Sequence, residues 1–426
     1  MTRLTHETSG HPLAPALSMA ARFDPTLIPV WSVSDGGVYS EWLSRSATEH
    51  REESGIARPK KRDATRDEAM VAVTDIKAPL RQAYIDVMAA LTMWKTLTAE
   101  QLAAFVGQPS IANRNNALIE DLWGADLIIR GRHPPGSRVP IFYRRTIGRP
   151  FHTFLDRLTY HERLAAFGGA KVDGVHHYER HDIVTAELAL RVSEHCSVMG
   201  VLGEPVASPA HIIGRSCTLH PTKQADMLIL RKDGLAIMVE TTASAQSRDY
   251  LIDKTTKWLD VMAADRTNST ALVLLALGTS RDRASTLAGW LRGTTTLAIR
   301  QHFEAQRLGL AERVAVVAWS DWFPEPGKVS PGFLTLRAKR PRLGVTSSAD
   351  TWEDVDLLDP FAVTSDVDLA AAKARSEFLR WYRPTPYWLR SATASYDWKT
   401  PILVEALGQE GAQQLIRRFR HYGSNR

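Results

Sequence analysis

Residues 225–242, ADMLILRKDGLAIMVETT, have the pattern of two apolar strands joined by a turn. Each strand carries one carboxylate at its outer end, Asp226 on the first strand and Glu240 on the second. A two-residue turn at 233–234 would put the two carboxylates on opposite faces of the hairpin. A three-residue loop at 232–234 instead places Gly234 where such loops need a left-handed residue. That loop pairs Asp226 directly with Glu240 on the same face.

The pairing of two carboxylates brings two negative charges close together. Residues directly opposite each other on an antiparallel pair have Cβ atoms about 4.5–5.5 Å apart, where like charges repel. A cation should compensate, and a divalent metal is the usual candidate because carboxylate oxygens are hard ligands. The sequence therefore makes Asp226 and Glu240 candidate ligands of a divalent metal.

Composition sets the broad class of the protein. A chain of 426 residues is expected to hold two or three domains, and a hydrophobic content of 44% is enough for real cores. We expect no transmembrane helix, a poor signal peptide at the N-terminus and a cytoplasmic location. Two cysteines exclude a disulfide framework and a four-cysteine zinc site. Residues 370–426 hold ten Lys and Arg against four Asp and Glu, which favours an anionic partner such as nucleic acid.

The chain divides into five predicted segments. Residues 1–78 have the character of a leader followed by a charged linker, and 323–365 are rich in Pro, Gly, Ser and Asp, as in a long linker. Between them lie two domains, at 79–150 and 151–322. Residues 366–426 form a basic tail with helices expected at 366–382 and 400–422. The aromatic stretch 381–388 between these helices is expected to pack as a small core, although its aromatics beside arginines could also stack on bases.

The order of elements in 79–150 is typical of a winged helix-turn-helix. Apolar spacing predicts a helix over 80–94, and the capping box of Thr98 and Gln101 opens a second helix that ends near Gly107. Ser110 is expected to cap a third helix that ends at Gly124. Two short strands at 127–130 and 140–143 complete the pattern.

This domain predicts a contact with double-stranded DNA. The third helix of a winged helix enters the major groove by its N-terminal part, where Arg suits guanine and Asn suits adenine. The hairpin supplies arginines for phosphates, which position the protein without specifying a sequence. The alternative is a winged helix used only for protein contacts. The predicted DNA-binding residues are Asn113, Arg114, Asn115, Asn116, Arg130, Arg132 and Arg138.

The domain at 151–322 has helices and strands in the order expected of a mixed sheet covered by helices. It resembles the restriction-endonuclease-like fold, whose motif is written PD-(D/E)xK, with Glu187 on its first helix and Asp226 and Glu240 on its second and third strands. The resemblance implies that these acids bind one or two divalent metals, usually magnesium, which polarise the scissile phosphate and generate the attacking hydroxide.

Two positions depart from this motif. Ala225 stands where the motif has proline, and Thr242 stands where it has the lysine that steadies the attacking water. A lysine can be supplied from the next helix, where Lys254 and Lys257 lie one turn apart. We take Lys254 as the charge stabiliser. A metal-dependent DNA endonuclease and a binding-only member of the fold therefore both remain open.

A closer resemblance covers residues 80–265. The run HDIVTAE at 181–187, then Asp226, then Glu240 followed by two threonines, and then Lys254 followed by an aromatic, resembles the replication-relaxation family of plasmids and integrative elements, found largely in Gram-positive bacteria. That family joins a winged helix to a domain of this kind. The resemblance implies DNA binding in plasmid replication or mobilisation, with no firmly established reaction. In either interpretation His181 orients the first helix or lines the acidic site.

Two functions follow as hypotheses. The first is a DNA-binding protein of a mobile element, serving replication, mobilisation or defence, whose nuclease-like domain contacts or cuts DNA as a homodimer or within a multiprotein DNA-processing complex. The second is a non-enzymatic replication or transcription regulator with a degenerate nuclease-fold scaffold. A third, a protein-only adaptor, would have no affinity for DNA.

Overall fold

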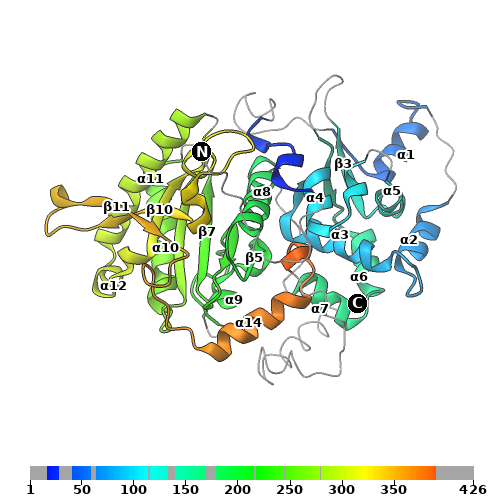
Figure 1. Cartoon of the computed structure of the whole chain (residues 1–426). Helices are drawn as coiled ribbons and strands as arrows, with labels where there is room; N and C mark the ends of the chain where they lie inside the picture. Colours follow the sequence, from blue (N-terminus) through cyan, green and yellow to red (C-terminus); the bar gives the residue numbers. More distant parts are fainter. Residues whose placement is uncertain are drawn as a thin grey trace, which may run out of the picture.

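The computed structural model describes residues 17–27, 41–58, 64–113, 116–132, 140–168, 179–214, 217–243, 246–278 and 280–389. Within these ranges the protein is a mixed α+β structure with a four-stranded and a seven-stranded sheet. Helix α8 (Glu179–His195) lies between the two halves of the molecule (Figure 1). None of the helices in these ranges is long and apolar enough to cross a membrane.

The smaller half contains the expected succession of three helices and a hairpin. Its sheet is antiparallel, with strand order β1-β3-β4-β2. Its elements are α3 (Arg81–Trp94), β2 (Thr96–Thr98), α4 (Ala99–Val106), the 3-10 helix η4 (Pro109–Ala112), α5 (Ala117–Gly124), β3 (Ile128–Arg132), β4 (Phe142–Arg145), α6 (Arg149–Asp156) and α7 (Tyr160–Phe167). The predicted capping box opens α4, where Thr98 accepts from the Gln101 amide, and Gly107 ends the helix in a left-handed conformation.

The third helix begins later than expected. Ser110 lies inside η4, directly after Pro109, and does not cap a helix. The cap of α5 is Asn116, whose side chain accepts a hydrogen bond from the Ile119 amide at 3.2 Å. The prediction of one helix from 110 to 124 was therefore wrong, because an asparagine side chain that accepts from the amide three residues later defines a new helix start.

The described parts of residues 1–78 contain helices and a strand, which a leader and a linker were not expected to have. Strand β1 (Glu41–Leu43) pairs with β3, and the helices α1 (Arg45–Glu53) and α2 (Arg66–Thr74) follow. Ser44 caps α1, and Thr65 and Glu68 form a capping box at α2. Two 3-10 helices, η1 (Met19–Ala21) and η2 (Pro25–Leu27), precede them. Charged helices anchored by a few apolar residues, such as the buried Met70 and Val73, resemble linkers in composition.

The larger half is built on the seven-stranded sheet, in the order β11-β10-β9-β8-β7-β6-β5. Strands β7, β8 and β9 are parallel, and the pairs on either side of them are antiparallel. Its elements from β5 to β9 are β5 (Gly200–Gly203), η5 (Glu204–Val206), α9 (Pro209–Ile212), β6 (Met227–Leu230), β7 (Ala236–Thr242), α10 (Arg248–Ala264), β8 (Thr270–Ala276), α11 (Arg281–Gln301), α12 (Phe303–Arg307), η6 (Leu310–Arg313) and β9 (Val314–Ala318).

The segment 323–365 is part of this sheet, and its interpretation as a linker was wrong. It holds β10 (Arg337–Arg342) and β11 (Thr351–Asp356), preceded by α13 (Trp319–Trp322) and η7 (Pro331–Thr335), with η8 (Ser347–Ala349) between the strands. Oppositely charged side chains face each other across the two strands, as in Lys339 with Asp354 at 2.7 Å and Arg340 with Glu353 at 2.8 Å. Charged side chains occupy most positions of the two strands, so their sequence lacks the usual apolar strand pattern.

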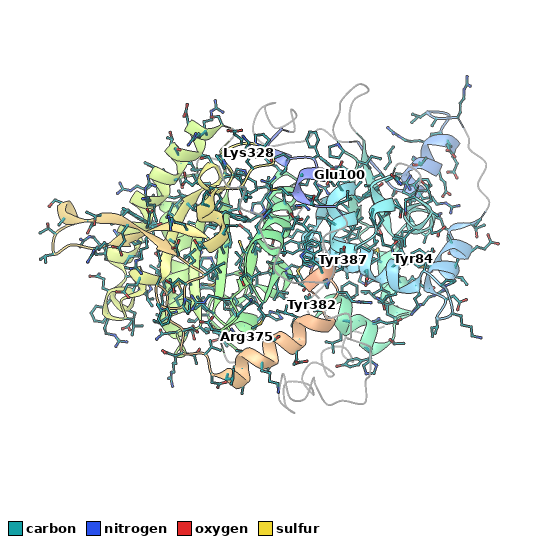
Figure 2. All side chains as sticks on the ribbon, in the orientation of Figure 1. Tyr84, Glu100, Lys328, Arg375, Tyr382 and Tyr387 are labelled. Atoms are coloured by element: carbon teal, nitrogen blue, oxygen red, sulfur yellow. The ribbon has the colours of Figure 1, made fainter. Side chains whose placement is uncertain are left out.

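The C-terminal part folds back over both halves. Helix α14 (Leu369–Trp381) is followed by η9 (Tyr387–Leu389), and Figure 2 places Tyr382 and Tyr387 where the two halves meet. Tyr382 and Trp388 are buried, and the Trp94 indole donates to the Pro384 carbonyl at 3.2 Å. The expected packing of the aromatic stretch as a core is confirmed. The helix expected at 400–422 lies outside the described residues.

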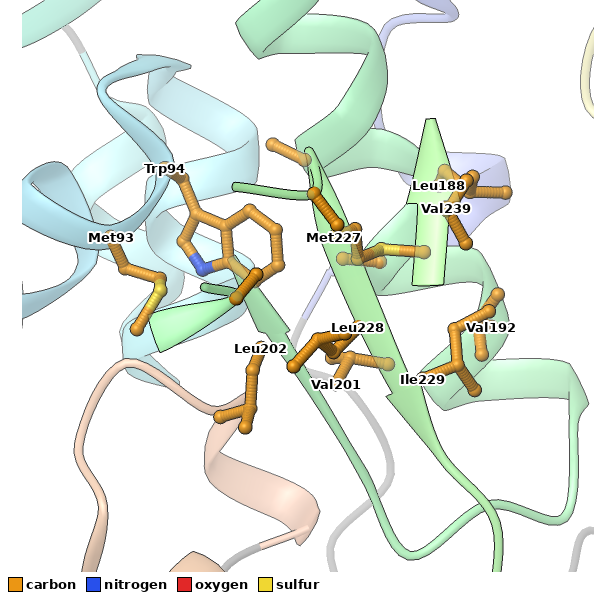
Figure 3. Packing of buried hydrophobic residues seen from close by; sticks show 14 of the residues in the cluster. Met93, Trp94, Leu188, Val192, Val201, Leu202, Met227, Leu228, Ile229 and Val239 are labelled. Atoms are coloured by element: carbon orange, nitrogen blue, oxygen red, sulfur yellow. The ribbon is translucent and has the colours of Figure 1, made fainter. Parts of the chain in front are cut away.

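One hydrophobic core runs through both halves. Leu188 and Val192 of α8 point toward the strands, and Met93 and Trp94 at the end of α3 lie on the other side of β5 and β6 (Figure 3). Helix α8 is thus packed against the sheet and against β2 and α4 at once. The end of α3 and Lys95, which follows it, therefore lie beside Asp226 at the outer end of the β6–β7 hairpin.

Candidate functional site

The β6–β7 hairpin has the register that pairs its carboxylates. Met227 lies opposite Val239 and Leu230 lies opposite Ala236. The Arg231 amide donates to the Leu235 carbonyl at 2.9 Å, which leaves a three-residue loop, and Gly234 in that loop has φ +91°. The expected loop is confirmed. The register, continued outward by one residue, sets Asp226 opposite Glu240 on one face.

Asp226 is held by an amide and an imidazole. Its Oδ2 accepts from the Thr241 amide at 2.6 Å and lies 3.0 Å from His181 Nε2. Burial opposes ionisation of Asp226, but the positive charges of His181 and Lys254 outweigh it and hold its pKa well below the usual range. Burial likewise opposes protonation of His181, but Asp226 and Asp182 raise its pKa to about 10. At neutral pH the contact is an ion pair between imidazolium and carboxylate.

Glu240 is buried and meets three donors. Its Oε1 accepts from Lys223 Nζ at 2.5 Å and from the Trp258 indole at 2.5 Å, and its Oε2 lies 2.5 Å from Lys254 Nζ. Burial alone would lower the pKa of Lys254. The charges of Glu240 and Asp226 raise it by a larger amount, so the net shift is upward. The expected compensating cations are therefore present as side chains of the protein itself, Lys223 and Lys254 at Glu240 and His181 at Asp226.

Helix α10 delivers the lysine that is missing from position 242. Ser247 caps this helix by accepting from the Tyr250 amide, and Lys254 and Trp258 lie one turn apart on its buried face. Lys257, the other lysine weighed for this role, pairs with Asp253 at 2.6 Å and is 41% exposed, so it lies away from the carboxylates. The structure brings Asp226, Glu240 and Lys254 together, as the sequence predicted.

Lys223 and His181 complete the group. His181 was expected to orient the first helix or line the acidic site, and it does lie against Asp226. Lys223 was missed. It lies only three residues before Asp226, but a lysine in a loop carries no pattern that sets it apart from a surface residue. Its contact with Glu240 depends on the path of the chain before β6.

Glu187 belongs to a different cluster. Its carboxylate accepts from Arg22 Nη2 at 2.9 Å, from Arg191 Nε at 2.9 Å and from the Gln101 side chain at 3.2 Å. Burial opposes its ionisation, but Arg22 and Arg191 hold its pKa below the usual range. The carboxylate of Glu187, which was predicted to support catalysis, is therefore bound by two arginines and the Gln101 amide. On α8 it is His181, six residues earlier, that reaches the hairpin.

A narrow pocket opens beside Asp226. It is lined by the end of α3, by α8 and by η5, including Lys95, His181, Asp182 and Glu204, and has room for about one water molecule. Lys95, which is ion-paired with Glu204, has φ +62° and ψ −71°, a conformation that costs a non-glycine residue energy. The smaller half of the molecule therefore contributes directly to the wall of the site.

The donor set fits a hard divalent cation in its chemistry. Asp226 and Glu240 supply carboxylate oxygens on one face of a rigid hairpin, which is the ligand type that Mg²⁺ prefers. An ion bound at Glu240 would lie beside the two ammonium groups that already contact this carboxylate. Within the described ranges there is no ready cluster of three or more His, Cys, Asp or Glu side chains for a metal.

The predicted DNA-binding residues are only partly described. Asn113 is exposed, whereas Asn116 caps α5 and donates to the Ser110 hydroxyl at 3.0 Å. Arg130 is ion-paired with Glu120 at 2.9 Å and lies over the Trp123 ring, so it is engaged with α5. Arg132 is described only as part of β3. Arg114, Asn115 and Arg138 lie outside the described residues.

Comparison with known proteins gives no relative from which a role could be transferred. No family model, no curated protein and no solved structure matches the chain.

Proposed function

We propose that the chain is a DNA-binding protein of a mobile element, acting in replication, mobilisation or defence. In this proposal the smaller half docks on duplex DNA, and the larger half acts on phosphodiesters with a divalent metal. Helices α3, α4 and α5 followed by the β3–β4 hairpin, with β2 on β4, have the order and pairing typical of a winged helix-turn-helix. The exposed Asn113 just before α5, and Arg114 after it in the chain, are the proposed groove-facing residues.

The larger half resembles the restriction-endonuclease-like core. A helix, three antiparallel strands, a second helix and a parallel strand follow one another as α8, β5–β7, α10 and β8. The observation that carries the proposal is the convergence of Asp226 and Glu240 across the hairpin with Lys254, which reaches Glu240 from α10. In this proposal two acids and a lysine from separate elements form the group that a metal-dependent cleavage would use.

Each side chain has a separable task in this proposal. A divalent metal held by Asp226 and Glu240 would polarise the scissile phosphate and provide the attacking hydroxide. Lys254 presents an ammonium to the negative charge that develops on the phosphate. His181 fixes the orientation of the Asp226 carboxylate through its contact with Oδ2.

A nicking assay on supercoiled plasmid with Mg²⁺ or Mn²⁺ tests the cleavage step. Asp226→Asn and Glu240→Gln are expected to abolish nicking, and Lys254→Met is expected to lower its rate at least 100-fold, the usual loss for one transition-state contact (roughly 10²–10³). Lys257→Met is the matched control, because Lys257 lies on the same helix but pairs with Asp253. Nicking that persists in Asp226→Asn would refute the assignment.

A second candidate is a non-enzymatic regulator that binds DNA. The observation in its favour is the saturation of Glu240 by Lys223, Lys254 and Trp258, which neutralises the site without a metal. This candidate predicts DNA binding that weakens steeply with salt and is indifferent to Mg²⁺. Arg114→Met should then weaken binding in a fluorescence-anisotropy titration, while Glu240→Gln should leave the affinity for DNA unchanged.

A further inference from the structure

The carboxylate of Glu240 has more cationic partners than its charge requires. Two ammonium groups and one indole N–H converge on its two oxygens, each at 2.5 Å. One lysine would be enough to balance the charge of this carboxylate. The second lysine therefore calls for a separate explanation.

The two lysines differ in how they are held. Lys254 lies on a 17-residue helix, and its charge acts on both Glu240 and Asp226. Lys223 comes from the loop before β6, reaches Glu240 Oε1 and lies 5.0 Å from the centre of the Trp258 ring. Its side chain is 17% exposed and that of Lys254 is 13% exposed, so the two lysines differ in the element that carries them rather than in exposure. Of the two, Lys223 is the one that can leave without disturbing the helix.

The position of Lys223 depends on a contact between His220 and Asp260 near the surface, here called the clasp. The Lys223 amide donates to the His220 carbonyl at 2.8 Å, and His220 Nε2 lies 2.7 Å from Asp260 Oδ2 on α10. His220 has φ +45°, a left-handed conformation that is uncommon for residues other than glycine. The clasp is 28% exposed at the histidine and 38% at the aspartate, which makes it weak.

We propose that Lys223 is a displaceable internal cation that competes with a divalent metal for Glu240. Metal binding then requires the ammonium to leave Oε1, and the affinity for metal depends on how firmly residues 217–224 are clasped to α10. The inference rests on the metal site of the proposed function. It adds that the chain itself lowers the affinity for metal, because Lys223 occupies Glu240 until this loop moves.

Terbium luminescence tests the proposal without any measurement of activity. Tb³⁺ is a hard oxygen-seeking ion, and Trp258, whose indole donates to Glu240, is placed to sensitise its emission. Lys223→Met is expected to bind Tb³⁺ at least tenfold more tightly than the wild type, because a neighbouring cation changes the affinity of a carboxylate for a proton by about one to three orders of magnitude. Competition with Mg²⁺ extends the comparison to the biological ion.

Matched variants separate charge from packing. Lys223→Arg keeps the cation and is expected to bind as weakly as the wild type. Lys257→Met removes a lysine of α10 that pairs with Asp253 and should change nothing. His220→Ala releases the clasp and should tighten binding without altering any charge at Glu240. Trp258→Phe should weaken the sensitised signal, and Trp94, which lines the pocket beside Asp226, accounts for what is left. Circular dichroism of each variant excludes misfolding as the cause.

Two outcomes would overturn the proposal in different ways. Equal Tb³⁺ affinity for the wild type and a folded Lys223→Met variant would refute the competition by Lys223 while leaving the metal site intact. If neither protein binds Tb³⁺ and Asp226→Asn is equally inert, the metal site itself is refuted, and the proposed cleavage function fails with it.

Discussion

Replacement of Arg22 by methionine should destabilise the protein strongly although Arg22 lies outside the candidate site. The Arg22 guanidinium is fully buried and donates to Glu187 at 2.9 and 3.2 Å, to the Leu17 carbonyl at 2.7 Å and to Glu194. Two arginines, Arg22 and Arg191, face three carboxylates in this cluster. Loss of one buried partner typically costs about 3–5 kcal/mol, and we expect a loss of that size in the free energy of unfolding.

The destabilisation caused by Arg22→Met should become smaller at acidic pH. Burial raises the pKa of Glu194 above its usual value even with Arg22 present, and removal of Arg22 takes away the charge that lowers it. A carboxyl whose pKa is higher in the folded than in the unfolded protein favours folding in its protonated form. The variant should therefore regain stability, relative to the wild type, as pH falls toward the ordinary pKa of 4.5 for glutamate.

Urea titrations followed by circular dichroism at several pH values measure both effects. A second change, Glu194→Gln, should restore part of the stability of Arg22→Met, because it removes the carboxylate left without its partner. Arg307→Met is the matched control, since that arginine pairs with Glu304 at the surface and its loss should have little effect. A loss under about 1 kcal/mol for Arg22→Met would show that the buried network is not what fixes α8, and would refute the argument.

Two further predictions concern the hairpin and the proposed DNA-docking half. Gly234→Ala should destabilise the protein by about 1–3 kcal/mol, because φ at this position is +91° and the new Cβ would lie 2.7 Å from Val367 Cγ1. A urea titration measures the change. An unchanged midpoint would contradict the three-residue loop. Asn116→Ala should cost about 1 kcal/mol through loss of the α5 cap, measured by thermal denaturation, whereas an exposed neighbour such as Asn113→Ala should cost nothing.

The hairpin could be predicted because its geometry is encoded locally. Gly234 lies at the third position of the loop between two apolar strands. A left-handed residue there favours the register that pairs Asp226 with Glu240. The capping box at Thr98 and the end of α4 at Gly107 are local signals of the same kind. Each of these features is determined by residues only a few positions apart, so it could be predicted from the sequence.

The partners of the site could not be predicted in the same way. Arg22 meets Glu187 across 165 residues of chain, and that contact turns a motif carboxylate into part of a structural cluster. The charged strands β10 and β11 resembled a linker because ion pairs across the hairpin replace apolar side chains. Lys223 approaches Glu240 from a loop whose path depends on His220 and Asp260. Each of these outcomes depends on tertiary contacts.

The two edges of the seven-stranded sheet have a consequence for how copies of the protein meet. β11 presents the charged sequence TWEDVD, whose acidic side chains pair with basic side chains of β10. At the other edge, the Gly203 amide of β5 donates to Met93 Sδ at 2.9 Å, and Leu379 of α14 packs against Gly200. Exposed strand edges act as templates for aggregation, and charge or a covering element prevents this. Both edges of the seven-stranded sheet therefore carry a feature that disfavours its growth by strand addition from a second copy.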